Sequence, residues 1–147
     1  MESNIKLCTD LKQSKKLKEI LSIESADHHY VRKVRDSWGN PFDGEWSIPK
    51  PGNPNSSKAN YIVMGFTSYE TFPCWSLAVL LEGVLPNKIV VNHLGYEKSC
   101  IFSFSDNSWY LSYYNDVTFC TLVAIIKESL LDACYEMILE LHKMNLL

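Results

Sequence analysis

The segment from residue 88 to residue 126 constrains the fold of this chain more than any other. Four short β-prone stretches alternate there with polar turns, at residues 88–92, 99–104, 109–114 and 117–126. Strands joined by short polar turns pair with their sequence neighbours in antiparallel fashion. The sequence therefore predicts a four-strand antiparallel meander over residues 88–126.

An amphipathic helix follows the meander directly. Ser129 and Asp132 form an S-x-x-D pattern, in which the serine oxygen caps the start of a helix. Apolar side chains then recur at helical spacing as far as Lys143, at Leu130, Cys134, Met137, Ile138 and Leu141. This apolar stripe must be buried, and one face of the meander is the obvious partner. We therefore predict an α+β fold with the C-terminal helix packed against the meander.

Two more helices and one strand are predicted before the meander. Residues 10–20 form an amphipathic helix with capping oxygens from Thr9 and Asp10, and Ser76 begins a central helix at 76–85. The apolar run at 61–66 is predicted to be a strand, and a short turn is expected at 25–30.

Residues 36–60 are predicted to be a long irregular loop. Four of the six prolines and three of the six glycines fall here. These residues interrupt both helices and strand pairing. Trp38, Phe42 and Trp46 are possible anchors of the loop, which either makes a contact with a partner or is pinned onto the body. At 147 residues the chain is expected to be a single domain, 1–147.

Composition narrows the classes of protein that fit. Hydrophobic residues make up 46% of the chain and charged residues 21%, an ordinary globular balance without an apolar run of about 18 residues. The first ten residues lack the layout of a signal peptide. Five cysteines without metal-ligand spacing fit neither a disulfide framework nor a zinc ribbon. We expect a cytoplasmic protein that does not associate with a membrane and binds neither a metal nor a cofactor. We expect Cys100, Cys120 and Cys134 to pack in the core.

Tyrosine and tryptophan supply the candidate contact residues. On the predicted strand 109–114, Tyr110 and Tyr114 share the face opposite the one that packs under the helix. Tyrosine offers contact area and a polar tip at little entropic cost, so an exposed tyrosine face is typical of protein contacts. We predict partner-binding roles for Tyr110, Tyr114, Trp38 and Trp46, with packing of the two tyrosines beneath another element as the open alternative.

Two alternative functions remain open at this stage. Cys74 precedes the central helix and is the best nucleophile candidate, and His28 with His29 is the most metal-like cluster, so a ligand-binding or enzymatic domain is one alternative. The other is binding of single-stranded nucleic acid by base stacking. It is disfavoured because residues 61–147 carry four Lys or Arg against nine Asp or Glu. Familiar catalytic motifs such as HExxH and GxSxG do not occur. An enzymatic function is therefore the less favoured hypothesis.

Self-association is also compatible with the sequence. The apolar stretch at 117–126 could lie at a sheet edge and pair across a two-fold axis, which would give a homodimer.

Three segments occur in a fixed order along the chain: TDLKQSKKL at 9–17, CWSLAVLLEGVLP at 74–86 and LLDACYEMILEL at 130–141. Taken together, they resemble a family of small uncharacterised proteins from gut Bacteroidetes genomes, their prophages and their phages. The sequence departs from the family at Glu140, where tryptophan is frequent, and in the long loop at 36–60. The resemblance implies a bacterial mobile-element setting and a cytoplasmic location, but no activity and no functional residues. Together these features favour a non-catalytic, protein-binding module of a bacterial or phage accessory region.

Overall fold

The structure is a computed structural model that describes residues 6–49, 61–64 and 67–147. The chain forms two compact units: an N-terminal unit of residues 10–76, and a C-terminal unit of residues 77–147 with the residues before Asp10. Helices and antiparallel sheets occur together, so the predicted α+β class is confirmed. None of the helices in the described part is long and apolar enough to cross a membrane. The single-domain interpretation stays a prediction.

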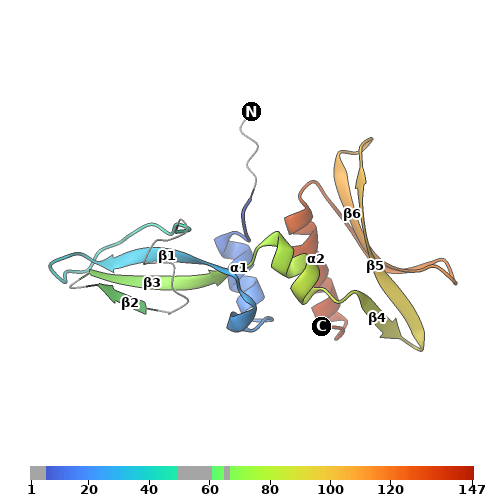
Figure 1. The fold of residues 1–147 in the computed structure, drawn as a ribbon, viewed down its shortest axis with the longest axis horizontal. Helices are drawn as coiled ribbons and strands as arrows, with labels where there is room; N and C mark the ends of the chain where they lie inside the picture. Colours follow the sequence, from blue (N-terminus) through green and yellow to red (C-terminus); the bar gives the residue numbers. More distant parts are fainter. Residues whose placement is uncertain (1–5, 50–60, 65–66) are drawn as a thin grey trace. The chain divides into compact units, whose positions relative to one another are not determined.

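The C-terminal unit contains the predicted meander. Its strands pair antiparallel in sequence order and lie side by side in Figure 1. They are β4 (Lys88–Val91), β5 (Leu94–Ser103), β6 (Ser108–Asn115) and β7 (Cys120–Lys127).

Local turn chemistry sets the strand boundaries. Asn92 and His93 both have positive φ, 50° and 68°, and they form the two-residue turn of a tight hairpin between β4 and β5. β5 therefore begins at Leu94, five residues earlier than the predicted start. At the other end, the side chain of Asn115 accepts hydrogen bonds from the backbone of Val117 and Thr118, which holds a longer turn before β7.

Helix α2 (Leu130–Lys143) covers one face of this sheet. Its start is capped as predicted, because the Ser129 hydroxyl accepts the Asp132 N–H at 3.3 Å. The helix contacts β6 and β7. Its buried face is formed by Leu131, Ala133, Cys134, Met137, Ile138 and Leu141. The core of the C-terminal unit lies between this face and the sheet.

The predicted central helix has an unusual geometry. Residues from Val79 to Val84 form a π-helix, η3, in which the backbone N–H of Leu85 reaches the carbonyl of Leu80. The ammonium group of Lys98 on β5 donates hydrogen bonds to the carbonyls of Leu81 and Leu85. This cation satisfies carbonyl groups that the end of the helix would otherwise leave unpaired.

The N-terminal unit contains a second sheet that the sequence did not predict in full. Its strands follow the order β1-β3-β2 and pair antiparallel (Figure 1). The elements of this unit are α1 (Leu11–Lys18), the short 3₁₀ helix η1 (Ile23–Ser25), β1 (His28–Arg35), β2 (Tyr61–Met64) and β3 (Thr67–Cys74). The strand predicted at 61–66 is confirmed over Tyr61–Met64, and residues 65–66 lie outside the described residues. The turn expected at 25–30 is wrong beyond Ser25, since β1 begins at His28.

Part of the predicted loop is fastened to the edge of β1. Isolated bridges join Val31 to Ser47 and Arg35 to Pro41, and the N–H of Gly44 donates to the carbonyl of Lys33. This segment thereby satisfies the outer backbone groups of β1, which would otherwise form an open sheet edge. Residues 50–60 of the predicted loop lie outside the described residues.

Candidate functional site

The outer face of the four-strand sheet carries a row of exposed apolar side chains. The strand register places Ile101 of β5, Tyr110 of β6 and Ile126 of β7 directly opposite one another. Opposed residues of an antiparallel sheet point to the same face, so these side chains form one row across three strands. Their exposed fractions are 59%, 39% and 59%. We call these three residues the outer row.

Packing of α2 explains why the outer row is exposed. Leu111 and Tyr113 alternate with Tyr110 along β6, and both are fully buried on the side of the sheet that α2 covers. Tyr114 shares the outer face with Tyr110 but is half-buried, and Ser112 between them is buried. The exposed part of β6 is therefore concentrated at Tyr110.

The hairpin that joins β5 to β6 ends in a cluster of aromatic rings. The ring centroid of Phe102 lies 5.1 Å from that of Phe104 and 5.1 Å from that of Trp109. A hydrogen bond of 3.1 Å from Ser103 to the Asp106 carboxylate spans the turn. Phe104 is 90% exposed although its turn is hydrogen-bonded, so an ordered backbone presents it to solvent.

Trp38 stands on a tight turn in the N-terminal unit. The Asp36 carboxylate accepts hydrogen bonds of 2.9 Å from the backbone N–H groups of Trp38 and Asn40. The bond from Asn40 contributes most to lowering the pKa of Asp36. Trp38 itself is 86% exposed. It therefore does not anchor the loop at 36–60, which was one of its two predicted roles.

Trp46, by contrast, is attached to the sheet of the N-terminal unit. The guanidinium carbon of Arg32 lies 4.8 Å from the centre of the Trp46 ring. The ring centroids of Trp46 and Phe72 are 6.2 Å apart, in a T-shaped arrangement. Arg32 also forms an ion pair with Glu70 at 2.6 Å. Trp46 is half-buried, and its predicted role as an anchor agrees with these contacts.

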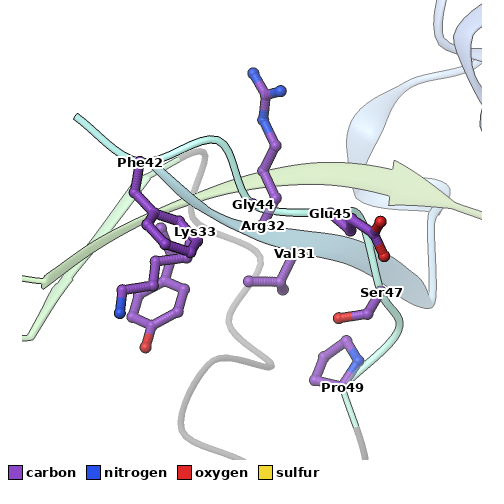
Figure 2. A pocket seen from close by; sticks show the side chains of 9 residues that line it. Val31, Arg32, Lys33, Phe42, Gly44, Glu45, Ser47 and Pro49 are labelled. Atoms are coloured by element: carbon purple, nitrogen blue, oxygen red, sulfur yellow. The ribbon is translucent and has the colours of Figure 1, made fainter. Parts of the chain in front are cut away.

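A small pocket opens beside β1. Figure 2 shows Lys33 and Phe42 on one side of it, Ser47 and Pro49 on the other, and Val31 between them. Its volume is about 250 Å³, slightly below the range of typical small-molecule sites. The ammonium of Lys33 lies 5.0 Å from the Phe42 ring centre. Polar side chains make up much of the lining, which also includes Arg32, Glu45 and Tyr69.

The four predicted contact residues are distributed over both units. Tyr110 and Tyr114 belong to the C-terminal unit, whereas Trp38 and Trp46 belong to the N-terminal unit. The sequence reasoning missed Ile101 and Ile126. Their alignment with Tyr110 depends on strand register, which the sequence does not reveal.

The alternative cysteine and histidine residues meet in the N-terminal unit. The register of β1 and β3 places His28 directly opposite Cys74, and His28 Nδ1 lies 3.0 Å from an oxygen of Asp27. Partial burial alone would raise the pKa of Asp27. Hydrogen bonds from Ser76 and the electrostatic attraction of His28 act in the opposite direction and are together stronger, so the pKa of Asp27 lies below its usual value. Cys74 is completely buried. Its thiol therefore cannot reach a substrate unless the strand pair opens.

The two adjacent histidines do not share one site. His28 and His29 project from opposite faces of β1, because side chains alternate along a strand. Among the residues that the structure describes, His, Cys, Asp and Glu side chains form no group of three that could hold a metal ion.

Thiol exposure separates the five cysteines and tests the nucleophile hypothesis. Cys100 and Cys120 are exposed, so their predicted core packing is wrong, whereas Cys8, Cys74 and Cys134 are buried. Burial raises the pKa of the Cys134 thiol to about 12.

We expect the two exposed thiols of the native protein to react with a thiol reagent at pH 8 within minutes, and the three buried thiols to react only after unfolding. Mass spectrometry of the labelled peptides checks this. Rapid labelling of Cys74 would instead favour a reactive thiol there.

Comparison with known proteins does not assign the chain to a family. No protein-family model, curated protein or solved structure matches it.

Proposed function

We propose that the chain is a non-catalytic protein-binding module, and that the outer row is the centre of its contact surface. The observation that carries this proposal is the alignment of Ile101, Tyr110 and Ile126 in one exposed row across three strands. Single exposed apolar residues are common on soluble proteins and need no explanation. Three of them in register form a contiguous patch, and contiguous apolar patches are typical of interaction sites.

The chemistry of the row fits a protein partner. A tyrosine between two isoleucines combines aromatic area with a hydroxyl tip, which is the composition of interface centres. The exposed ring of Phe104 at the hairpin end would add a second anchor. The setting in a bacterial or phage accessory region is part of the proposal and rests on the resemblance of the sequence to that family.

The charge of the C-terminal unit disfavours nucleic acid as the ligand of this surface. Residues 77–147 contain four lysines and no arginine, against eight aspartates and glutamates. Protein surfaces that bind nucleic acid neutralise its phosphates with lysine and arginine side chains, whereas an acidic unit would repel the phosphates. A small-ligand or enzymatic function has weaker support, because Cys74 is buried and the pocket beside β1, at about 250 Å³, is slightly smaller than typical small-molecule sites.

Affinity capture with matched variants tests the proposal. Tagged protein is incubated with a Bacteroidetes lysate, and bound proteins are quantified by mass spectrometry. We expect one partner in stoichiometric amount with the unaltered chain, and at least tenfold less with Tyr110→Ser or Ile101→Ser. Truncation of a central anchor of an interface costs about 2 kcal/mol or more, and about 1.4 kcal/mol is already a tenfold loss of affinity. Val117→Ser is the control: Val117 is 81% exposed in the turn after β6, outside the outer row.

Two results would contradict the proposal. One is recovery of the same partner by all variants, which would move the contact away from the outer row. The other is recovery of the protein alone. Circular dichroism spectra of the variants must match that of the unaltered chain, so that loss of binding is not loss of fold. Trp46→Ala, made in parallel, reports whether the N-terminal unit contributes to the same contact.

A further inference from the structure

The pocket beside β1 has one wall that backbone hydrogen bonds hold in place. This wall is the segment 42–49, which we call the pocket wall. Val31 and Ser47 exchange two hydrogen bonds, of 2.8 Å and 3.0 Å, and the N–H of Gly44 donates to the carbonyl of Lys33 at 3.0 Å. A Cβ at residue 44 would lie 2.5 Å from that carbonyl oxygen, so the close approach requires glycine. The pocket is therefore preformed by the chain itself.

One end of the pocket carries a cation without an ion-pair partner in the described part of the chain. Lys33 and Tyr69 are directly opposite each other in the register of β1 and β3, so their side chains lie on one face of the sheet. The Lys33 ammonium lies over the Phe42 ring. The Asp36 carboxylate is near enough to feel its charge, but the two groups form no ion pair. Among the described residues, the Tyr69 hydroxyl has no hydrogen-bond partner either. Both groups can donate to a bound acceptor.

The remaining lining restricts the kind of acceptor that fits. Val31 and Pro49 supply apolar surface (Figure 2). Arg32 points away from the pocket, and its guanidinium pairs with Glu70 instead. The side chain of Glu45 lies beside Ser47, at the end remote from Lys33. A ligand with one negative charge thus fits at the Lys33 end, whereas a second negative charge at the other end would meet a carboxylate.

We propose that this pocket binds a small monocarboxylate with an apolar body. Its carboxylate accepts hydrogen bonds from Lys33 and Tyr69, and its body lies against Val31 and the Phe42 ring. Hydrogen bonds from an ammonium to a carboxylate are charge-assisted and stronger than neutral ones. A volume of about 250 Å³ limits the body to roughly one ring or one branched chain. All the residues involved belong to the N-terminal unit, so the inference does not depend on the outer row.

Titration of the isotope-labelled full chain with phenylacetate, followed by NMR, tests the proposal. We expect the amide signals of Lys33, Gly44 and Ser47 to shift, with a dissociation constant of about 1 mM or lower, as suits a ligand of this size. Phenethylamine has the same ring and a positive charge, and we expect it to leave these signals unchanged. Acetyl-glycyl-phenylalanine presents the same chemistry at a peptide C-terminus. If it binds more tightly than phenylacetate, the carboxylate comes from a peptide, and if more weakly, from a free acid.

Matched variants assign the charge that binds the carboxylate. Lys33→Met keeps most of the side-chain length but removes the ammonium, and we expect it to weaken phenylacetate binding by about tenfold. Tyr69→Phe removes only a hydroxyl and should weaken binding by about threefold, which keeps the test valid if Lys33→Met disturbs the fold. Lys15→Met is the control, because it makes the same change at an exposed position of α1 in the same unit. Its dissociation constant should equal that of the unaltered chain.

The opposite results would overturn the proposal. An absence of shifts at about 10 mM phenylacetate would remove the site. Equal binding of phenethylamine would contradict the recognition of a carboxylate. An unchanged dissociation constant in both Lys33→Met and Tyr69→Phe, or an equal loss of affinity in Lys15→Met, would place the binding elsewhere. The readout is the binding of a small acid to the N-terminal unit, whereas the proposed function is read from captured proteins, so the two can fail separately.

Discussion

Replacement of Trp75 by alanine should destabilise the N-terminal unit by about 3–5 kcal/mol, the cost of removing a buried tryptophan from a packed core. Trp75 follows β3 directly and its side chain has no exposed surface. Its indole N–H donates a hydrogen bond of 2.9 Å to the hydroxyl of Ser25 in η1. The Ser25 hydroxyl in turn donates to the carbonyl of Ser22. The substitution therefore removes packing volume and a partly buried hydrogen bond together. Urea unfolding followed by circular dichroism measures the loss.

Two variants isolate the cause of this loss. Trp75→Phe keeps most of the ring volume but not the N–H donor, so we expect an intermediate destabilisation of about 1–3 kcal/mol. Trp38→Ala removes the same side chain at a position that is 86% exposed, and its effect should stay within about 0.5 kcal/mol. Equal effects of Trp75→Ala and Trp38→Ala would contradict the assignment of Trp75 to the core.

The contrast between these two tryptophans shows a limit of sequence analysis. Both residues are large and apolar, and composition treats them alike. Trp38 lies in a turn held by Asp36, whereas Trp75 lies where a strand passes into a helix. Only the three-dimensional path of the chain assigns the second to the core.

The meander and α2 could be predicted because their signals are local. Polar turns separate the strands, and the helix has both a capping serine and a regular apolar stripe. Strand β1 of the N-terminal sheet escaped prediction because it mixes Val31 with charged residues such as Arg32 and Lys33. These side chains are accommodated by ring contacts and by the ion pair with Glu70, which join residues distant in sequence. Such pairings are invisible to a periodicity argument.

Only the part of the candidate site that depends on alternation along a single strand could be predicted. Alternation along one strand placed Tyr110 on the face opposite to Leu111 and Tyr113, and this requires no knowledge of the neighbouring strands. The contributions of Ile101 and Ile126 depend on the register across three strands. The bulge in β7 shifts that register by one residue, and no feature of the isolated sequence indicates it.

The core beneath the outer row has a sensitivity to alkaline pH that one substitution should remove. The Tyr113 hydroxyl is buried and donates a hydrogen bond of 2.6 Å to the carbonyl of Pro86. Burial raises the pKa of this phenol well above its usual value near 10, and the neighbouring Cys134 thiol raises it further. The folded state thus holds a proton that the unfolded state releases above pH 10.

The sign of the pH effect follows from this difference. Below pH 10 the phenol is protonated in both states, and its contribution to stability is complete. As the pH rises further, ionisation stabilises the unfolded state, and the free energy of unfolding falls by about 1.4 kcal/mol per pH unit for this group. Tyr113→Phe should cost about 1–2 kcal/mol at pH 7, because the Pro86 carbonyl loses its donor. The stabilities of variant and unaltered chain should then converge between about pH 10 and pH 12.

Urea unfolding at a series of pH values measures this convergence. Tyr110→Phe is the matched control, since it removes a hydroxyl from the same strand on the exposed face, and its effect on stability at pH 7 should stay within about 0.5 kcal/mol. A constant gap between Tyr113→Phe and the unaltered chain up to pH 12 would mean that the Tyr113 phenol ionises equally well in both states. That result would be incompatible with a hydroxyl that is desolvated between the sheet and α2.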